Sequence, residues 1–207
     1  MKRCVIIGGA EIRDYNTLRE QLKPDDFNIF CDSGLYHKEK LAIPANLIVG
    51  DFDSHPQPDT DVETILLPRE KDDTDTVFAV KEAISRGFSD FLFLGVCGGR
   101  LDHTLGNVSI LLLLHNRGLS GKIIDDYSEM EILDSKVKYI DDSYPYFSIL
   151  NIDGVCRGVY EKNVKFPLDN AEITSEYQYG ISNEVLPGKL AEVCVKKGRA
   201  LLVKVRN

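Results

Sequence analysis

The strongest constraint on the fold of this chain is an alternation of short apolar runs with helix-like segments up to about residue 126. The runs are rich in β-branched or aromatic residues, and they predict strands at residues 4–7, 28–31, 47–49, 64–67, 91–94 and 122–124. Helical periodicity predicts helices at residues 17–22, 76–86 and 104–117. This alternation is typical of parallel βαβ units. We therefore predict an α/β domain over residues 1–126, a Rossmann-like parallel sheet with helices on both faces.

Beyond residue 126 the pattern changes to short strands that are broken by Gly, Pro, Asn and Asp. Strands are expected at residues 131–133, 146–150, 192–195 and 201–205. The turn Lys196-Lys197-Gly198-Arg199 is expected to join the last two strands in a hairpin. Residues 127–207 are therefore predicted to form an all-β, sandwich-like domain.

Charge and cysteine content narrow the classes of function. The net charge of −8 argues against nonspecific binding to nucleic acid, which depends on clustered Lys and Arg. The five cysteines are scattered without a CxxC pair, so they fit neither a disulfide framework nor a zinc site and favour a reducing cytoplasm. The first apolar run is too short for a signal peptide, and no later run is long enough to cross a bilayer, so no membrane partner is expected.

Acidic residues follow the predicted strands in three clusters: Asp51 with Asp53, Asp72 with Asp75, and Asp102. Ligands bind at the carboxyl ends of the strands in open α/β sheets, so these clusters are expected to share one crevice. Asp51 and Asp53 point the same way in an extended segment and repel each other unless a cation lies between them. Mg²⁺ suits such a pair, although Asp-x-Asp also occurs in solvated turns.

The second cluster precedes the predicted helix at residues 76–86, and one of its side chains is expected to cap that helix. A cap requires one side chain, so the surplus carboxylates among Asp72, Asp73, Thr74 and Asp75 are expected beside the crevice. The alternative is that all of them serve the helix N-terminus. Because a helix N-terminus attracts anions, Lys71 is a further candidate for contact with phosphate.

The third cluster, Gly98-Gly99-Arg100, combines glycines that let the backbone approach a ligand with a guanidinium that suits phosphate oxygens. Asp32-Ser33-Gly34 also follows a predicted strand, although it could be only a tight turn. We expect His103 and His37 to be capping or hydrogen-bonding residues. The chain has no GxxxxGK[ST], GxGxxG or GxSxG motif, which excludes P-loop enzymes, ordinary dinucleotide-binding proteins and the usual serine hydrolases.

With these residues in view, the chain resembles the thiamine pyrophosphokinase (thiamine diphosphokinase) family of bacteria and eukaryotes. The motifs that carry this resemblance span most of the chain in their order and spacing. The resemblance rests on Asp32-Ser33-Gly34, Gly50-Asp51-Phe52-Asp53-Ser54, Lys71-Asp72-x-Thr74-Asp75, Gly98-Gly99-Arg100-Leu101-Asp102-His103 followed by Asn107, and Gly180-Ile181-Ser182-Asn183-Glu184.

The resemblance implies an ATP:thiamine diphosphotransferase that forms thiamine diphosphate and AMP, with Mg²⁺, in a homodimer with a shared active site. It implies that Asp51, Asp53 and Asp75 hold Mg²⁺, and that Ser182 and Asn183 face thiamine. The implied catalytic residues are Asp72, Arg100 and Asp102, and either Asp72 or Asp102 is the candidate to accept the proton of the hydroxyl. The implied nucleotide contacts are Asp32, Ser33, Gly34, Lys71, Thr74, Arg100 and Asn107.

Two features of the sequence leave alternatives open. Trp is absent, so any stacking on the rings of thiamine must come from Tyr or Phe, and Ser182-Asn183 could equally be a plain turn. Clustered aspartates with Mg²⁺ also serve attack by water, so a Mg²⁺-dependent nucleotide phosphohydrolase is the alternative function. A nucleotide-binding regulatory module is less consistent with so many candidate metal ligands.

Overall fold

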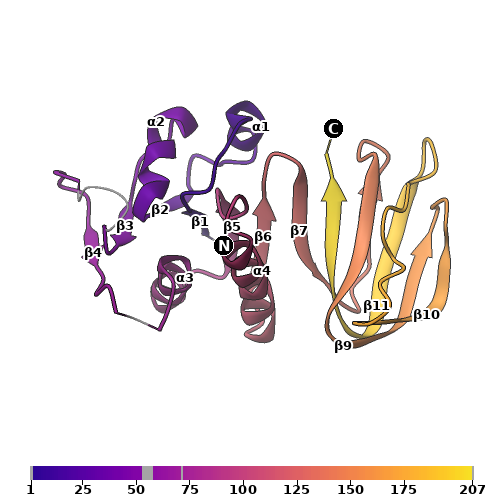
Figure 1. Ribbon diagram of the computed structural model, residues 1–207. Coiled ribbons are helices and arrows are strands. Elements are labelled where there is room, and N and C mark those ends of the chain that lie inside the picture. The colour runs from indigo at the N-terminus through magenta and orange to yellow at the C-terminus, as the bar shows by residue number, and fades with distance from the viewer. Residues whose placement is uncertain (1, 53–57, 71, 207) are drawn as a thin grey trace. The chain divides into compact units, whose positions relative to one another are not determined.

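The computed structural model describes residues 2–52, 58–70 and 72–206 (Figure 1). The chain divides into two compact units, Met1–Asp126 and Tyr127–Asn207. Among the described residues, no helix has both the length and the apolar character needed to cross a membrane.

The first unit is built on a parallel sheet, as the sequence predicts. Its strands lie in the order β6-β5-β1-β2-β3-β4, and each neighbouring pair is parallel. The chain adds β2, β3 and β4 on one side of β1 and then β5 and β6 on the other, so the order reverses between β1 and β5. The strands are β1 (Arg3–Ile7), β2 (Phe27–Cys31), β3 (Leu47–Gly50), β4 (Thr64–Leu66), β5 (Asp90–Leu94) and β6 (Ser120–Ile124).

Helices cover both faces of this sheet, which confirms the predicted fold class. Figure 1 shows α1 and α2 on one face, and α3 and α4 on the other. On the first face, Leu18 and Leu41 are buried in one cluster with Val5 and Leu92 of the sheet. The helical segments are α1 (Tyr15–Arg19), the 3₁₀ helix η1 (Asp32–His37), α2 (Lys38–Leu41), α3 (Asp75–Ser85) and α4 (Leu101–Asn116).

The boundaries of α3 follow from its sequence. Thr74 is the N-cap residue, and its side chain accepts a hydrogen bond from the backbone N–H of Val77 at 3.3 Å. The buried positions Thr76, Ala79, Val80 and Ala83 have the spacing of one helical face. The helix thereby places its N-terminus at the carboxyl ends of the strands.

The second unit is all-β and antiparallel. Strand β11 pairs with β9 along nearly its whole length, with β8 beside its first half and β7 beside its second half. Strand β10 pairs with the later part of β9. The strands are β7 (Ser128–Leu133), β8 (Lys138–Asp141), β9 (Tyr146–Lys162), β10 (Leu168–Thr174) and β11 (Leu190–Val205).

The predicted hairpin at Lys196-Lys197-Gly198-Arg199 is wrong, because β11 continues through this segment as one strand. Gly198 has a φ of 95°, and the register against β9 shifts between Lys197 and Arg199. A glycine with left-handed backbone suits a bulge as well as a turn, so the local sequence does not separate the two. Pairing with β9 on both sides of the shift keeps the strand from reversing.

One hydrophobic core fills the β unit. Val193 and Val195 from the first half of β11 join Ala200 and Leu202 from its second half in a single buried cluster. Both halves of β9 contribute to the same cluster, for example Ile149 and Val159. The two bent strands therefore enclose the core from both sides, in a sandwich-like arrangement.

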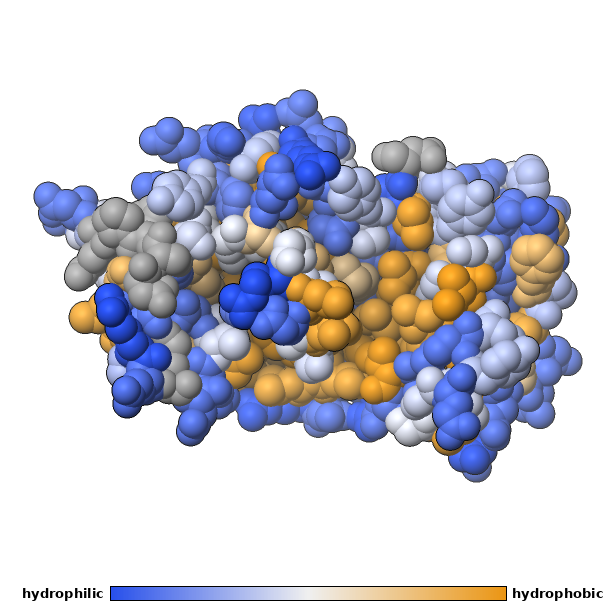
Figure 2. All heavy atoms as spheres, in the orientation of Figure 1, coloured by the Kyte–Doolittle hydropathy of each residue, from blue (hydrophilic) through white to orange (hydrophobic). Residues whose placement is uncertain are grey.

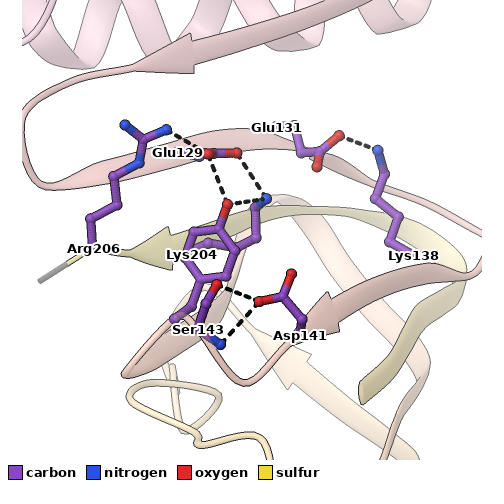
Figure 3. Close-up of polar contacts among 8 residues, drawn as sticks. Glu129, Glu131, Lys138, Asp141, Ser143, Lys204 and Arg206 are labelled. Atoms are coloured by element: carbon purple, nitrogen blue, oxygen red, sulfur yellow. Dashed lines mark hydrogen bonds and ion pairs between the residues drawn. The ribbon is translucent and has the colours of Figure 1, made fainter. Parts of the chain in front are cut away.

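A buried ionic network ties β7 to β11 near the end of the chain (Figure 3). The carboxylate of Glu129 accepts hydrogen bonds from Arg206 Nη2 at 2.5 Å and from the Tyr144 hydroxyl at 2.8 Å, and it pairs with Lys204 Nζ at 2.8 Å. The side chain of Glu129 is 6% exposed. Two cations thus compensate one buried carboxylate, as burial of a charge requires.

Candidate active site

A cavity of about 480 Å³ lies in the α/β unit, at the carboxyl ends of β1, β2 and β5. The loop after β1 forms one wall with residues 8–11, and Arg100 and other residues of the loop after β5 form another. Ser33, which follows β2, also lines the cavity, as do Thr76 of α3 and Asn107 of α4. This volume is in the range of pockets that bind small molecules and cofactors.

The cavity lies where the order of the strands reverses, between β1 and β5, and this is the place where open α/β sheets bind ligands. The loops after these two strands are joined by backbone hydrogen bonds from Gly8 N to Leu94 O at 2.9 Å and from Ala10 N to Gly95 O at 2.8 Å. A Cβ atom on Gly8 would lie 2.6 Å from the carbonyl oxygen of Gly95. Glycine at position 8 is therefore required for this close approach.

His37 holds the loop after β1 in place by a hydrogen bond. The ring is buried, and its two nitrogens lie 2.9 Å from the carbonyl oxygen of Ala10 and 2.8 Å from the hydroxyl of Tyr15. A carbonyl oxygen only accepts, so Nε2 donates to Ala10 and Nδ1 accepts from Tyr15. Burial lowers the pKa of His37, which favours this neutral form. The expected hydrogen-bonding role of His37 is confirmed.

Arg100 lines the cavity in a bidentate pair with Asp102. Arg100 Nε lies 2.9 Å from Asp102 Oδ1, and Nη2 lies 2.5 Å from Oδ2. This guanidinium holds the pKa of Asp102 well below its usual range. Both side chains are exposed, so this ion pair contributes little to stability.

Two side chains of α4 organise the loop after β5. Asn107 is buried and donates from Nδ2 to the carbonyl oxygen of Val96 at 2.8 Å. Thr104 accepts from the backbone N–H of Gly98 at 3.1 Å. Sequence reasoning selected Asn107 but missed Thr104, although Thr in the first turn of a helix is a familiar hydrogen-bonding residue.

The segment Asp32-Ser33-Gly34 reaches the cavity through Ser33 alone among these three residues. Gly34 packs on β1, where an added Cβ atom would lie 2.3 Å from the carbonyl oxygen of Ile7. Asp32 is buried at the start of η1, with a φ of 45°.

The ends of β2 and β3 meet the start of α3. An added Cβ atom on Gly50 would lie 3.1 Å from Asp32 Cα, and Cys31 Sγ lies 3.8 Å from the backbone oxygen of Asp75. Asp51 follows Gly50 directly and, like Asp75, is half-buried. The fold therefore brings the neighbourhoods of Asp32, Asp51 and Asp75 together, although these residues are distant in the sequence.

Only some of the predicted metal ligands lie among the described residues. Asp53 and Lys71 lie outside the described residues. Within the described part of the chain, no three or more His, Cys, Asp or Glu side chains are grouped so that they could hold a metal ion. The donors at the strand ends are carboxylates, which suit Mg²⁺, an ion that proteins usually hold with one or two carboxylates and substrate phosphates. Asp72 is exposed, and Thr74 uses its hydroxyl as the helix cap.

A second cavity, of about 490 Å³, lies in the β unit. Asn183 and Glu161 line it together with the aromatic residues Phe166 and Tyr179. Ser182 is exposed and is not among the lining residues; its backbone N–H donates to Ser148 Oγ at 3.1 Å. Of the two residues predicted to face thiamine, Asn183 therefore lies at this cavity.

Comparison with protein families assigns both units. Residues 18–122 match the model "Thiamin pyrophosphokinase, catalytic domain", and residues 134–199 match "Thiamin pyrophosphokinase, vitamin B1 binding domain". The chain is also 28% identical over 119 residues to the thiamine pyrophosphokinase of Bacillus subtilis (strain 168). That match spans 56% of this chain and 56% of the relative, so it covers little more than half of either.

Solved structures share the fold over almost the whole chain. A thiamine pyrophosphokinase from Bacillus subtilis has a TM-score of 0.87 at 21% identity, with all of both chains covered. A thiamin pyrophosphokinase from Geobacillus thermodenitrificans has a TM-score of 0.84 at 24% identity, covering 99% of this chain and 98% of that one. The enzyme from Candida albicans has a TM-score of 0.76 at 14% identity, covering 100% and 89%. With a catalytic-domain match over residues 18–122 and a binding-domain match behind it, the chain belongs to the thiamin pyrophosphokinase family.

Proposed function

We propose that this protein transfers the pyrophosphoryl group of ATP to the primary hydroxyl of thiamine, giving thiamine diphosphate and AMP. The observation that carries the proposal is a nucleotide-sized cavity at the reversal point of the sheet, in a chain that matches both domains of the family. The match to a vitamin B1 binding domain also favours this transferase over the alternative phosphohydrolase, because hydrolysis of a nucleotide requires no such domain.

ATP binds in the cavity of the α/β unit in this proposal. The loop after β1 and Ser33 contribute backbone and hydroxyl groups, and Arg100, held by Asp102 through Nε and Nη2, donates from Nη1 to a phosphate oxygen. Asn107 acts by holding the loop that carries Arg100. Asp32, Gly34 and Thr74 flank the proposed nucleotide site, and Lys71, which lies outside the described residues, is a further proposed contact.

Mg²⁺ is the proposed metal, held by Asp51, Asp53 and Asp75 and supported by Asp72. When bound, it neutralises phosphate charge, which a chain with a net charge of −8 needs in order to accept ATP. The meeting of the ends of β2 and β3 with the start of α3 supports this ligand set.

The hydroxyl of thiamine loses a proton during transfer, and the two candidate acceptors differ in environment. Arg100 lowers the pKa of Asp102, which makes this carboxylate a weak base. Asp72 is exposed near the start of α3 and has no ion pair with an arginine among the contacts described. We therefore propose Asp72 as the acceptor, and assign Arg100 and Asp102 to the phosphates.

The reaction is tested by incubating the purified protein with MgATP, with and without thiamine, and separating the products by chromatography. The proposal expects AMP and thiamine diphosphate in equal amounts, and only when thiamine is present. Release of phosphate without thiamine would instead identify the phosphohydrolase.

The metal site is tested with Asp51→Asn and Asp75→Asn, each of which removes one charge and keeps the side-chain shape. Activity is expected to fall at least a hundredfold, with a higher Mg²⁺ concentration needed for half-maximal rate. Asp61→Asn, at an exposed position, is the matched control and should behave as the unsubstituted protein. Unchanged Mg²⁺ dependence in both site variants would contradict the assignment.

We also propose a homodimer with a shared active site, located in the cytoplasm. Figure 2 shows hydrophobic side chains gathered over α4, where Leu101 and Leu105 are 68% and 60% exposed. A second copy that covers this apolar surface would remove it from water. The buried free thiols of Cys4 and Cys31 are consistent with a reducing compartment. Light scattering of the purified protein tests the dimer, and a monomer at micromolar concentration would contradict it.

A further inference from the structure

We propose that Glu161 receives a nitrogen donor of thiamine in the cavity of the β unit and thereby sets the affinity for the vitamin. This inference rests on the proposed function and deepens it by naming the residue and the chemical group that it recognises.

Glu161 is a charged residue in the middle of a sheet. It belongs to β9 and is paired on one side with Leu168 of β10 and on the other with Val193 of β11. It is 2% exposed, yet it lines the cavity of about 490 Å³. A carboxylate that is removed from water in this way requires compensation by donors or by a positive charge.

The protein supplies little of this compensation. Among the described residues, Asn183 is the only side chain that donates to Glu161. The cation that also lines the cavity, Lys165, is engaged by the carboxylate of Glu184 at 2.7 Å. Glu161 therefore faces the cavity with acceptor capacity that a ligand can fill.

The orientation of Asn183 determines which atoms of Glu161 remain available. Asn183 Oδ1 accepts from the backbone N–H groups of Phe166 at 3.1 Å and Glu184 at 2.9 Å. Asn183 Nδ2 must then point the other way, where it donates to Glu161 Oε2 and to the carbonyl oxygen of Phe166. The amide thus occupies one oxygen of Glu161, and Oε1 is left to meet the ligand.

The remaining walls suit a flat, nitrogen-rich ligand. Phe166 and Tyr179, 59% and 40% exposed, offer aromatic surface at the same cavity. Thiamine carries an aminopyrimidine, which donates N–H, and a cationic thiazolium ring. Both properties match a carboxylate beside aromatic walls, and these aromatic residues can take the place of the Trp that the chain lacks.

The principal test is Glu161→Gln, with Glu172→Gln on the exposed face of β10 as the matched control. In the variant, the glutamine oxygen meets Asn183 Nδ2, so the glutamine NH₂ faces the cavity and opposes a donor from the ligand. We expect the KM for thiamine to rise at least tenfold and the KM for ATP to stay within twofold. Calorimetric titration with thiamine, without turnover, should show the same loss of affinity.

A second variant keeps the test decisive if Glu161→Gln folds poorly. Phe166→Ala alters an exposed side chain, and it is expected to raise the KM for thiamine at least fivefold, whereas Leu190→Ala, also at an exposed position, is not. Unchanged thiamine affinity in Glu161→Gln, or an equal rise of both KM values, would overturn the inference. If the unsubstituted protein forms no thiamine diphosphate, the proposed function fails instead, so the two failures are distinguishable.

Discussion

His37 donates from Nε2 to the carbonyl oxygen of Ala10 at 2.9 Å, so the turn after β2 holds the loop that follows β1. Because that loop is one wall of the cavity of the α/β unit, this hydrogen bond connects a buried ring to the proposed ATP site. The ring itself is not among the lining residues, so its effect on ATP is one of positioning.

Replacing His37 by Leu is expected to raise the KM for ATP about tenfold, because the loss of about 1.4 kcal/mol of positioning corresponds to that factor. The KM for thiamine should change less than twofold. His37→Gln keeps a donor for Ala10 and is expected to restore most of the ATP affinity. An equal loss in the two variants would show that the ring contributes by packing, not by its hydrogen bond.

Replacing Arg100 by Ala separates catalysis from stability. Both side chains of the pair are exposed, so the free energy of unfolding should change little. Turnover should fall by about two orders of magnitude, because a phosphate contact is lost in the transition state. Thermal unfolding and steady-state rates measure the two effects, and Arg117→Ala is a control at an exposed position beyond α4.

The pH dependence of stability should report on Glu161. Burial raises the pKa of this carboxyl to about 7, while the hydrogen bond from Asn183 partly opposes that change. Between an unfolded value of about 4.3 and this folded value, the native state binds more protons, so stability falls as pH rises. At pH 8, ionisation of Glu161 in the folded protein then lowers the free energy of unfolding by on the order of 3 kcal/mol.

Glu161→Gln removes this ionisation. We expect the variant to be more stable than the unsubstituted protein at pH 8, and similar to it at about pH 4.5. Urea unfolding at the two pH values measures the difference. A variant that is less stable at pH 8 would show that the carboxylate is compensated in the native protein.

The ionic network in Figure 3 offers a test of buried charge. Glu129→Gln leaves Lys204 and Arg206 with one carboxylate fewer in a buried setting, and should cost about 3 kcal/mol of unfolding free energy. Glu131→Gln on the same strand breaks a pair with the more exposed Lys138, and should cost less than about 1 kcal/mol. Similar losses of unfolding free energy in the two variants would show that burial does not make the Glu129 network more important for stability than the Glu131 pair.

The α/β half could be predicted from the sequence because its strands are short apolar runs separated by clear helical periodicity. Local patterns suffice there, since each βαβ unit repeats the same order. The bulge at Gly198 could not be predicted, because a glycine between lysine and arginine suits a turn as well as a bulge. Pairing with β9, forty residues earlier in the chain, decided between them.

Part of the candidate site could also be predicted from the sequence, and part could not. Ser33 and Arg100 follow predicted strands and carry polar groups, whereas Asn107 was selected from the family resemblance, and all three line the cavity. The loop at residues 8–11 was missed as a wall, since its glycines carry no chemistry that a motif could show. Glu161 was missed because its partner, Asn183, is brought to it only by folding of the β unit.

The unbroken course of β11 has a consequence for how the β unit loses its structure. Residues Leu190–Val205 pair with β7, β8 and β9, so detaching this strand removes a hydrogen-bonded neighbour from all three strands at once. The remaining strands retain no intact core, because both halves of β11 contribute to one buried cluster. The unit should therefore open all at once, with amide protons throughout its core exchanging at a common slow rate.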